Sequence, residues 1–347
     1  MNAALRAAAQ TAGARGAAVL GVRDGYDGLM DGRFVAFGRS AVDSDAFDSN
    51  ALDFVARQGG TVLGTARSER FLRPEGRARA AEQLRGRGVS GLLVVGGNGS
   101  LTGAHLLARE TGVAVVGVPG SIDNDIGCTA TCIGVDTALN TIVEACDRIS
   151  DTARSHRRAF VVEVMGRQSG YLAMAAAVAV GADAVVFREQ QRTPEALVEA
   201  VAEVVRKAFT ERGKRRVLVL KAEGVEVPTL RLVHLVEEAV KPTLAGLEIR
   251  GVVLGHLVRG GNPSFLDRMV AARLAFAATT ALLEGATDEM VAWQSPLPGG
   301  IATSDASVRR FSLEAVLAET ARLLDGSSPV TQRRVGLMSK VEGVLQL

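Results

Sequence analysis

The sequence predicts an α/β protein with doubly wound parallel sheets arranged in two domains. Short apolar runs alternate with longer amphipathic stretches along most of the chain, as they do where strands are joined by helices. Several of these runs end in glycine-rich turns, and open α/β sheets bind ligands at that end of their strands. A chain of 347 residues, 47% hydrophobic and 22% charged, can bury a substantial core and is long enough for two such domains.

Composition excludes several classes of partner. The 40 basic and 38 acidic residues leave a net charge of +2, so no general field attracts nucleic acid or a membrane surface. No apolar run approaches the roughly 18 residues of a membrane span. The three cysteines, Cys128, Cys132 and Cys146, form no CxxC pair, which predicts buried reduced thiols and a cytoplasmic location. Any anion recognition must therefore be local.

The first candidate site follows an apolar run at 92–95. The run ends in a loop in which three of five residues are glycines, and a helical spacing begins at Leu101. Glycines let the backbone approach a ligand closely, and the N–H groups at the start of the next helix can point at an anion. We expect this loop to bind phosphate through Gly96, Gly97, Asn98, Gly99 and Ser100.

A second candidate site follows the valine-rich run at 113–118. Pro119 and Gly120 break the run, and Asp123 and Asp125 follow on a loop. Two acids beside a phosphate loop suit a general base and a magnesium ligand. The alternative interpretation is an Asx-rich turn whose carboxylates are merely solvated.

Four motifs together resemble one family. GGNGS at 96–100, PGSIDND at 119–125, VEVMGRQSG at 162–170 and GHLVRGGNP at 255–263 occur in the order seen in bacterial-type, ATP-dependent 6-phosphofructokinases, the phosphofructokinase A family. The resemblance extends from residue 1 to about 310. It implies two Rossmann-like domains with the active site in the cleft between them. The larger, nucleotide-binding domain would comprise 1–134 and 258–308, and the smaller, sugar-phosphate-binding domain 135–257 and 309–347.

The resemblance also implies a reaction, namely transfer of a phosphoryl group from ATP to the 1-hydroxyl of fructose 6-phosphate in glycolysis. Asp123 would be the base, Ser121 would lie beside the transferred group, and Arg167 would stabilise its developing charge. Mg²⁺ would be the cofactor, held by Asp125 and by Asn98. The nucleotide would contact Arg67, Gly97, Asn98, Gly99 and Ser100.

By the same resemblance, the sugar would be held by Met165, Gly166 and Glu223. Its 6-phosphate would be bound by four basic residues, of which the first two come from a neighbouring subunit: Arg158, Arg250, His256 and Arg259. A shared site of this kind implies an oligomer, and we expect a homotetramer.

Some positions depart from the family pattern or separate its branches. Pyrophosphate-using relatives usually carry aspartate and lysine where this chain has Gly99 and Gly120, which favours ATP. Asn98 stands where the family has a metal-binding aspartate, and an amide is a weaker ligand for Mg²⁺. Met1 resembles an internal methionine of a family pattern in which a strand and a first glycine loop come earlier. A pyrophosphate-dependent enzyme, or a catalytically impaired regulatory subunit, therefore remains an alternative.

The spacing of apolar residues in the rest of the chain predicts the positions of helices and strands. We expect a helix at the start of the chain, a helix from an N-cap at Asp136 to about 149, and an amphipathic helix over 308–324. Further helices are predicted over 194–212 and 229–245. Strands are predicted over 17–22, 59–67, 159–164, 184–187, 217–220 and 252–254.

Overall fold

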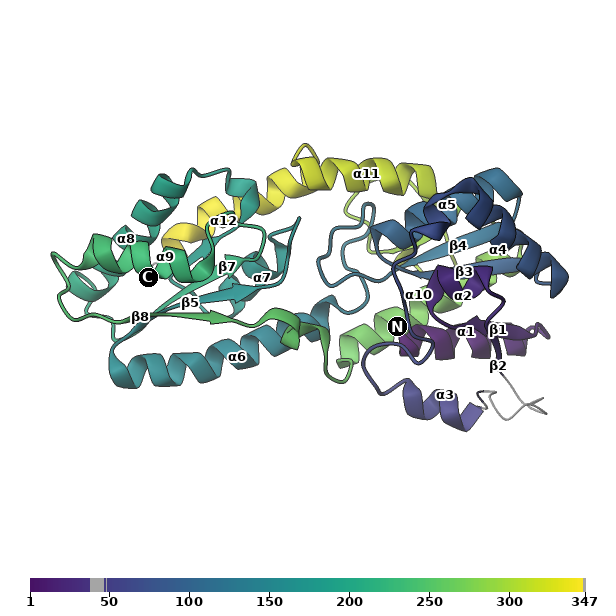
Figure 1. The fold of residues 1–347 in the computed structure, drawn as a ribbon, viewed down its shortest axis with the longest axis horizontal. Helices are drawn as coiled ribbons and strands as arrows, with labels where there is room; N and C mark the ends of the chain where they lie inside the picture. The colour runs from purple at the N-terminus through teal and green to yellow at the C-terminus, as the bar shows by residue number, and fades with distance from the viewer. Residues whose placement is uncertain (38–46, 48, 346–347) are drawn as a thin grey trace. The chain divides into compact units, whose positions relative to one another are not determined.

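The computed structural model describes residues 1–37, 47 and 49–345, so the last two residues assigned to the smaller domain lie outside it. It confirms the α/β fold class (Figure 1). The contacts divide the chain into two compact units. The first comprises 1–121, 126–134 and 261–321, and the second comprises 122–125, 135–260 and 322–347. This division differs from the expected one in grouping 122–125 and 258–260 with the second unit and 309–321 with the first.

The first unit is built on a mixed sheet. Parallel pairing joins β3 (Gly91–Gly96), β4 (Ala114–Pro119) and β9 (Glu289–Trp293), and antiparallel pairing adds β11 (Val308–Ser312) and β10 (Ile301–Ala302). β1 (Val19–Val22) and β2 (Phe34–Phe37) form a separate antiparallel pair. The helices are α1 (Asn2–Ala14), α2 (Gly25–Met30), α3 (Ser49–Val55), η1 (Arg70–Leu72), α4 (Pro74–Gly86), α5 (Asn98–Thr111) and α10 (Phe265–Leu283).

The second unit is built on a parallel sheet in the order β6-β7-β5-β8. These strands are β5 (Ala159–Val164), β6 (Ala184–Val186), β7 (Val217–Ala222) and β8 (Ile249–Val253). The helices are α6 (Val135–His156), α7 (Tyr171–Ala179), η2 (Arg188–Gln190), α8 (Pro194–Thr210), α9 (Thr229–Val240), η3 (Gly255–Arg259) and α12 (Pro329–Leu345). α11 (Leu313–Asp325) begins in the first unit and ends in the second.

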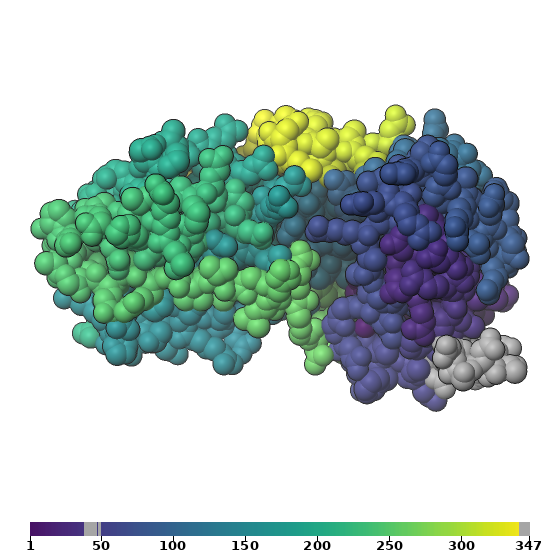
Figure 2. All heavy atoms as spheres, in the orientation of Figure 1, coloured from purple at the N-terminus to yellow at the C-terminus, as the bar shows by residue number. Residues whose placement is uncertain are grey.

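Each unit has its own apolar core, which lies beneath the surface atoms drawn in Figure 2. In the first unit, small alanines on α1 and α10 allow these two helices to pack closely against each other, and α10 packs against the valines of β4. In the second, one face of the sheet packs against α8 and α9 through aliphatic side chains. No helix of the described chain is long and apolar enough to cross a membrane.

Three predicted elements are wrong. The strand predicted over 59–67 is an irregular segment, because Gly60 and Gly64 have positive φ and the Val62 amide donates to Asn2 Oδ1 at 2.8 Å. Residues 308–312 form a strand, not the start of a helix, because they pair with β9. Asp136 is not an N-cap, since α6 begins at Val135 and continues to His156.

β3 is an edge strand among the described residues, since it pairs with β4 alone. Its side chains are half-buried, whereas every residue of β4 after Ala114 is buried. A largely apolar cavity of about 780 Å³ lies along this edge, lined by Leu93 and Val95 of β3, Val19 and Leu20 of β1, and Leu282 of α10.

Candidate active site

Asp123 is the most unusual carboxylate of the predicted set. Its Oδ1 atom is inaccessible to solvent and, within the described part of the chain, accepts no hydrogen bond. A buried carboxylate oxygen without a donor is costly unless a ligand or a reacting group supplies the missing partner. The site therefore has an acceptor available for a proton.

The surroundings of Asp123 raise its pKa above the ordinary carboxyl value. Burial is the main cause, the negative charges of Asp125 and Glu223 add to it, and the positive charge of Arg259 opposes it. The second unit therefore brings four of the predicted residues into one electrostatic group. A carboxylate with increased proton affinity is suited to act as a general base.

The loop that carries Asp123 is held in place by Arg334, a residue for which the sequence predicted no role. Asn124 has φ of 49° and is 1% exposed. Its carbonyl accepts a hydrogen bond from Arg334 Nη1 of α12 at 3.4 Å, and the Arg334 guanidinium lies over the Tyr171 ring at 4.5 Å. The C-terminal helix, for which no motif predicted a role, thus joins this loop to the start of α7.

Three loops at the carboxyl end of the parallel sheet carry the predicted sugar-binding residues. The Glu223 amide donates to the Val164 carbonyl at 2.9 Å, and the Gly224 amide donates to the Gly166 carbonyl at 3.2 Å. Gly166 has φ of 132°, and a Cβ there would lie 2.3 Å from the Ser169 carbonyl oxygen, so only glycine fits. Met165 is half-buried, and the polar side chains are exposed: Arg167, Glu223, His256 and Arg259.

Arg158 and Arg250 lie at the opposite end of the same sheet. Both bind Glu248 Oε2, Arg158 through Nε at 2.5 Å and Arg250 through Nη2 at 3.0 Å. Arg250 is in register with Phe160, the second residue of β5. Five further residues lead to the loop after β5, which is about 17 Å at roughly 3.3 Å per residue. Within one chain these two arginines cannot bind the same phosphate as His256 and Arg259.

The predicted phosphate loop is the first turn of a helix. Gly97 is the N-cap of α5, so residues 98–100 are helical and do not form an extended loop. The Tyr26 hydroxyl donates to the Ser100 carbonyl at 2.5 Å, which fixes this turn. A Cβ at Gly99 would meet nothing within 4 Å, and one at Gly97 would lie 3.7 Å from Ser121 Cβ. Ser121 therefore lies beside an accessible helix N-terminus, a feature whose N–H groups favour anions in general.

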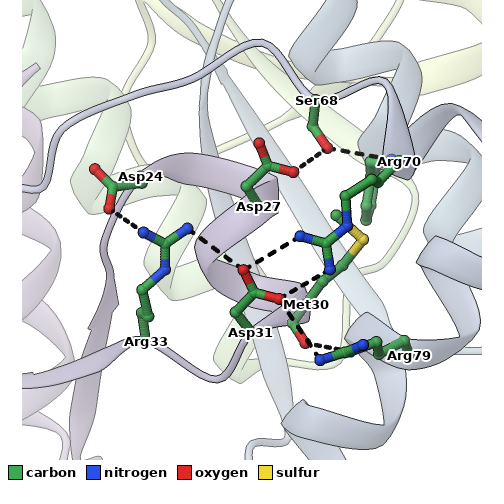
Figure 3. Close-up of polar contacts among 9 residues, drawn as sticks. Asp24, Asp27, Met30, Asp31, Arg33, Ser68, Arg70 and Arg79 are labelled. Carbon is green, nitrogen blue, oxygen red and sulfur yellow. Dashed lines mark hydrogen bonds and ion pairs between the residues drawn. The ribbon is translucent and has the colours of Figure 1, made fainter.

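Arg67 is exposed, and the residues that follow it are anchored to α2. Figure 3 shows the contacts of Ser68 and Arg70 with Asp27 and Asp31. The Ser68 hydroxyl donates to Asp27 Oδ1 at 2.6 Å. Arg70 binds both carboxylate oxygens of Asp31, at 2.8 and 3.2 Å. The hydrogen bond from Arg70, with other arginines nearby, holds the pKa of Asp31 below its ordinary value. These contacts fix the backbone next to Arg67.

The donor set fits a magnesium ion that substrate phosphates help to hold. The described residues contain no group of three or more His, Cys, Asp or Glu side chains placed to bind a metal by themselves. Mg²⁺ commonly uses only one or two carboxylates and takes its other ligands from water and phosphates. The pair Asp123 and Asp125, with an orphaned carboxylate oxygen, is compatible with that mode.

Comparisons with known proteins identify one family that this chain resembles over most of its length. The sequence model of the family Phosphofructokinase matches residues 1–282. An ATP-dependent 6-phosphofructokinase of Thermotoga neapolitana is 41% identical over 93% of this chain and 95% of its own length. ATP-dependent 6-phosphofructokinase 1 of Thermus thermophilus is 43% identical over 84% of each chain.

Among solved structures, phosphofructokinase from Saccharomyces cerevisiae is similar with a TM-score of 0.81 and 28% identity, covering 99% of this chain and 48% of that one. A pyrophosphate-dependent phosphofructokinase from Marinobacter aquaeolei has a TM-score of 0.71 and 22% identity, covering 91% of this chain and 80% of that one, and shows the shared fold alone.

Proposed function

This chain belongs to the phosphofructokinase family, and we propose that it transfers the γ-phosphoryl group of ATP to the 1-hydroxyl of fructose 6-phosphate. The products are ADP and fructose 1,6-bisphosphate, and the reaction belongs to glycolysis, which agrees with the expected cytoplasmic location. The observation that carries the proposal is the buried, hydrogen-bond-free oxygen of Asp123 among Asp125, Glu223 and Arg259.

Asp123 acts as the general base. Its carboxylate accepts the proton of the sugar 1-hydroxyl as the hydroxyl oxygen forms its bond to the γ-phosphorus. The bond from that phosphorus to the bridging oxygen breaks, and the electron pair leaves with ADP. Phosphoryl transfer needs positioning and charge neutralisation more than covalent help from the protein. A base whose proton affinity is raised by burial suits this step.

Charge on the phosphates is balanced by donors from different elements. The N–H groups of the first turn of α5, at Gly97, Asn98, Gly99 and Ser100, bind nucleotide phosphate, and the exposed Arg67 adds a cation. Arg167 stabilises the negative charge that grows on the transferred group, and Ser121 donates a hydrogen bond beside it.

Asp125 would hold Mg²⁺, with Asn98 as a second, neutral oxygen ligand. When bound, the ion supplies positive charge that neutralises the phosphate oxygens. An amide binds a hard cation more weakly than a carboxylate does, so the protein needs more magnesium than a relative with aspartate at position 98.

The sugar is held by Met165, Gly166 and Glu223, and its 6-phosphate by His256 and Arg259. Arg158 and Arg250 complete the phosphate site from a neighbouring subunit. Their position at the far end of the β5 and β8 strands supports this assignment, because they cannot reach the loops of their own chain. The active form is therefore a homo-oligomer, and we propose a tetramer.

Space at two glycines supports ATP as the donor. A Cβ at Gly99 would meet nothing within 4 Å, and one at Gly120 would have only ordinary contacts of 3.6 Å or more, so no side chain restricts the nucleotide there. The test supplies fructose 6-phosphate and Mg²⁺ with either ATP or pyrophosphate and measures fructose 1,6-bisphosphate. Activity with ATP alone is expected. Activity with pyrophosphate alone would overturn the donor assignment, and sugar phosphate binding without turnover would overturn the kinase assignment.

A further inference from the structure

An ion pair between a buried lysine and a half-buried glutamate lies where the pattern of the sheet predicts two aliphatic residues. Alternate residues of β5 and β7 face α8 and α9, and Ala159, Val161, Val217 and Val219 lie in that apolar core. The next residues on the same face are Glu163 and Lys221, which are paired in register. Lys221 is 1% exposed, and its Nζ lies 2.9 Å from Glu163 Oε2.

The pair is bonded to the structure around it. The Thr229 hydroxyl, at the first residue of α9, donates to the same Glu163 oxygen, and Lys221 Nζ also donates to the Ala222 carbonyl at 3.4 Å. The Glu163 carbonyl accepts the amide of Leu254, just after β8, at 3.0 Å. Glu163 is therefore joined to the ends of β7 and β8 and to the start of α9.

Stability alone does not explain a charged pair at this place. Removing two charges from water costs about as much as their attraction returns, and apolar residues of similar volume are often as stable or more so. The pair lies immediately before the segments that carry Met165, Gly166 and Glu223. A hydrogen-bonded ion pair has a specific geometry, so it fixes the relative position of the two strand ends more closely than aliphatic contact does.

We propose that Lys221 and Glu163 are positioning residues for sugar phosphate binding. They hold the carboxyl ends of β5, β7 and β8 in the register that presents Met165, Glu223 and His256 together. Neither side chain touches the reacting atoms. This inference rests on the proposed function for its kinetic test but not for its structural one.

The kinetic test compares Lys221→Met with a matched control. Lys221→Met keeps the side-chain length and leaves Glu163 unpaired, so the KM for fructose 6-phosphate should rise about tenfold or more, since small misplacements of a binding group have large effects. The KM for ATP should change less than twofold, because the predicted nucleotide-binding residues belong to the first unit. Lys221→Met combined with Glu163→Gln removes the unpaired charge and should restore folding stability but not sugar phosphate affinity.

The control is Asp183→Asn, at the other end of the same sheet. Asp183 is 3% exposed in its side chain, binds Lys214 Nζ at 2.6 Å and accepts the Leu218 amide at 2.9 Å. Its loss should lower the thermal midpoint without changing the KM for fructose 6-phosphate. Equal effects of Lys221→Met and Asp183→Asn on that KM would overturn the proposal, as would an equal rise in the KM for ATP.

Hydrogen exchange gives a readout that does not depend on turnover. The amides of Glu223, Gly224 and Leu254 are the donors that join the three loops, so they should exchange faster in the double variant of Lys221 and Glu163 than in the parent. They should be unchanged in Asp183→Asn. Unchanged exchange in the double variant would overturn the positioning role even if the parent proved inactive on fructose 6-phosphate.

Discussion

Asp123→Asn should separate catalysis from stability. The substitution keeps the shape of the side chain and removes its charge. Because it removes the base, turnover should fall by about 10² to 10⁴-fold, or roughly 2.7 to 5.5 kcal/mol of transition-state stabilisation. The affinity for fructose 6-phosphate should change little, since Asp123 does not bind the 6-phosphate.

The same variant should be more stable than the parent at neutral pH. Burial and the charges of Asp125 and Glu223 raise the pKa of Asp123 in the folded protein. A group with a raised folded pKa contributes its stability below the unfolded pKa, near 3.9, and loses it as the pH rises through the folded pKa. Asn stays neutral at every pH. The free energy of unfolding of the variant should therefore exceed that of the parent by an amount that grows as the pH rises from the unfolded to the folded pKa, and that reaches about 1.4 kcal/mol for each unit of difference between the two pKa values.

Urea unfolding at pH 7 and at the lowest pH where the parent folds measures this difference, and steady-state kinetics measures turnover. Asp147→Asn, an exposed position on α6, is the matched control and should alter neither quantity. A parental turnover number for Asp123→Asn would refute the assignment of the base. A variant less stable than the parent at pH 7 would refute the argument from burial, because both side chains leave the same oxygen unbonded.

Four further variants test other parts of the structure. Arg250→Ala should raise the KM for fructose 6-phosphate and leave that for ATP unchanged, because it removes a contact to the non-reacting phosphate; the reverse pattern in initial-rate assays would contradict the assignment. Asn98→Asp should lower the magnesium concentration needed for half-maximal rate, and a parent already saturated at low magnesium would show that the amide suffices. Thr279→Val should raise the free energy of unfolding by about 1 kcal/mol, since its buried hydroxyl has no partner among the described residues; a lower value in urea titrations would reveal a bond to water. Arg334→Ala should lower kcat by about tenfold by releasing the Asn124 carbonyl, and unchanged kinetics would limit α12 to a structural role.

Local pattern predicted much of the fold because strand and turn signals agree along the chain. The apolar run before Gly96 and the glycines after it predicted β3 followed by a helix, which the structure confirms. The predicted and observed secondary structures differ where tertiary contacts determine the backbone conformation. Val308 and Phe311 have helical spacing, yet pairing with β9 satisfies the backbone and makes a strand. Val62 and Leu63 look like strand residues, but their backbone groups bind Asn2 and Asp24.

The candidate site shows the same division. Asp123 and Asp125 could be proposed from the sequence because they lie two residues apart on one loop, and the motifs at 165–167 and 255–259 could be proposed because each follows a strand. The grouping of Glu223 and Arg259 with these two carboxylates could not be proposed from the sequence pattern, since it depends on which strands are neighbours in the sheet.

The supporting residues are the least predictable part, for a physical reason. Arg334 reaches Asn124 across 210 residues of chain, and Lys221 reaches Glu163 across 58. Each supports a loop by one directed polar contact, which leaves no periodic pattern in the sequence. A helix of mixed polarity and a lysine after an aliphatic run have no evident function until the fold brings their partners into contact. The binding loops follow the carboxyl ends of the strands and need a fixed relative position. A buried charge at the carboxyl end of a strand is therefore a reason to look for a site beyond it, whereas one at the opposite end, such as Asp183, is not.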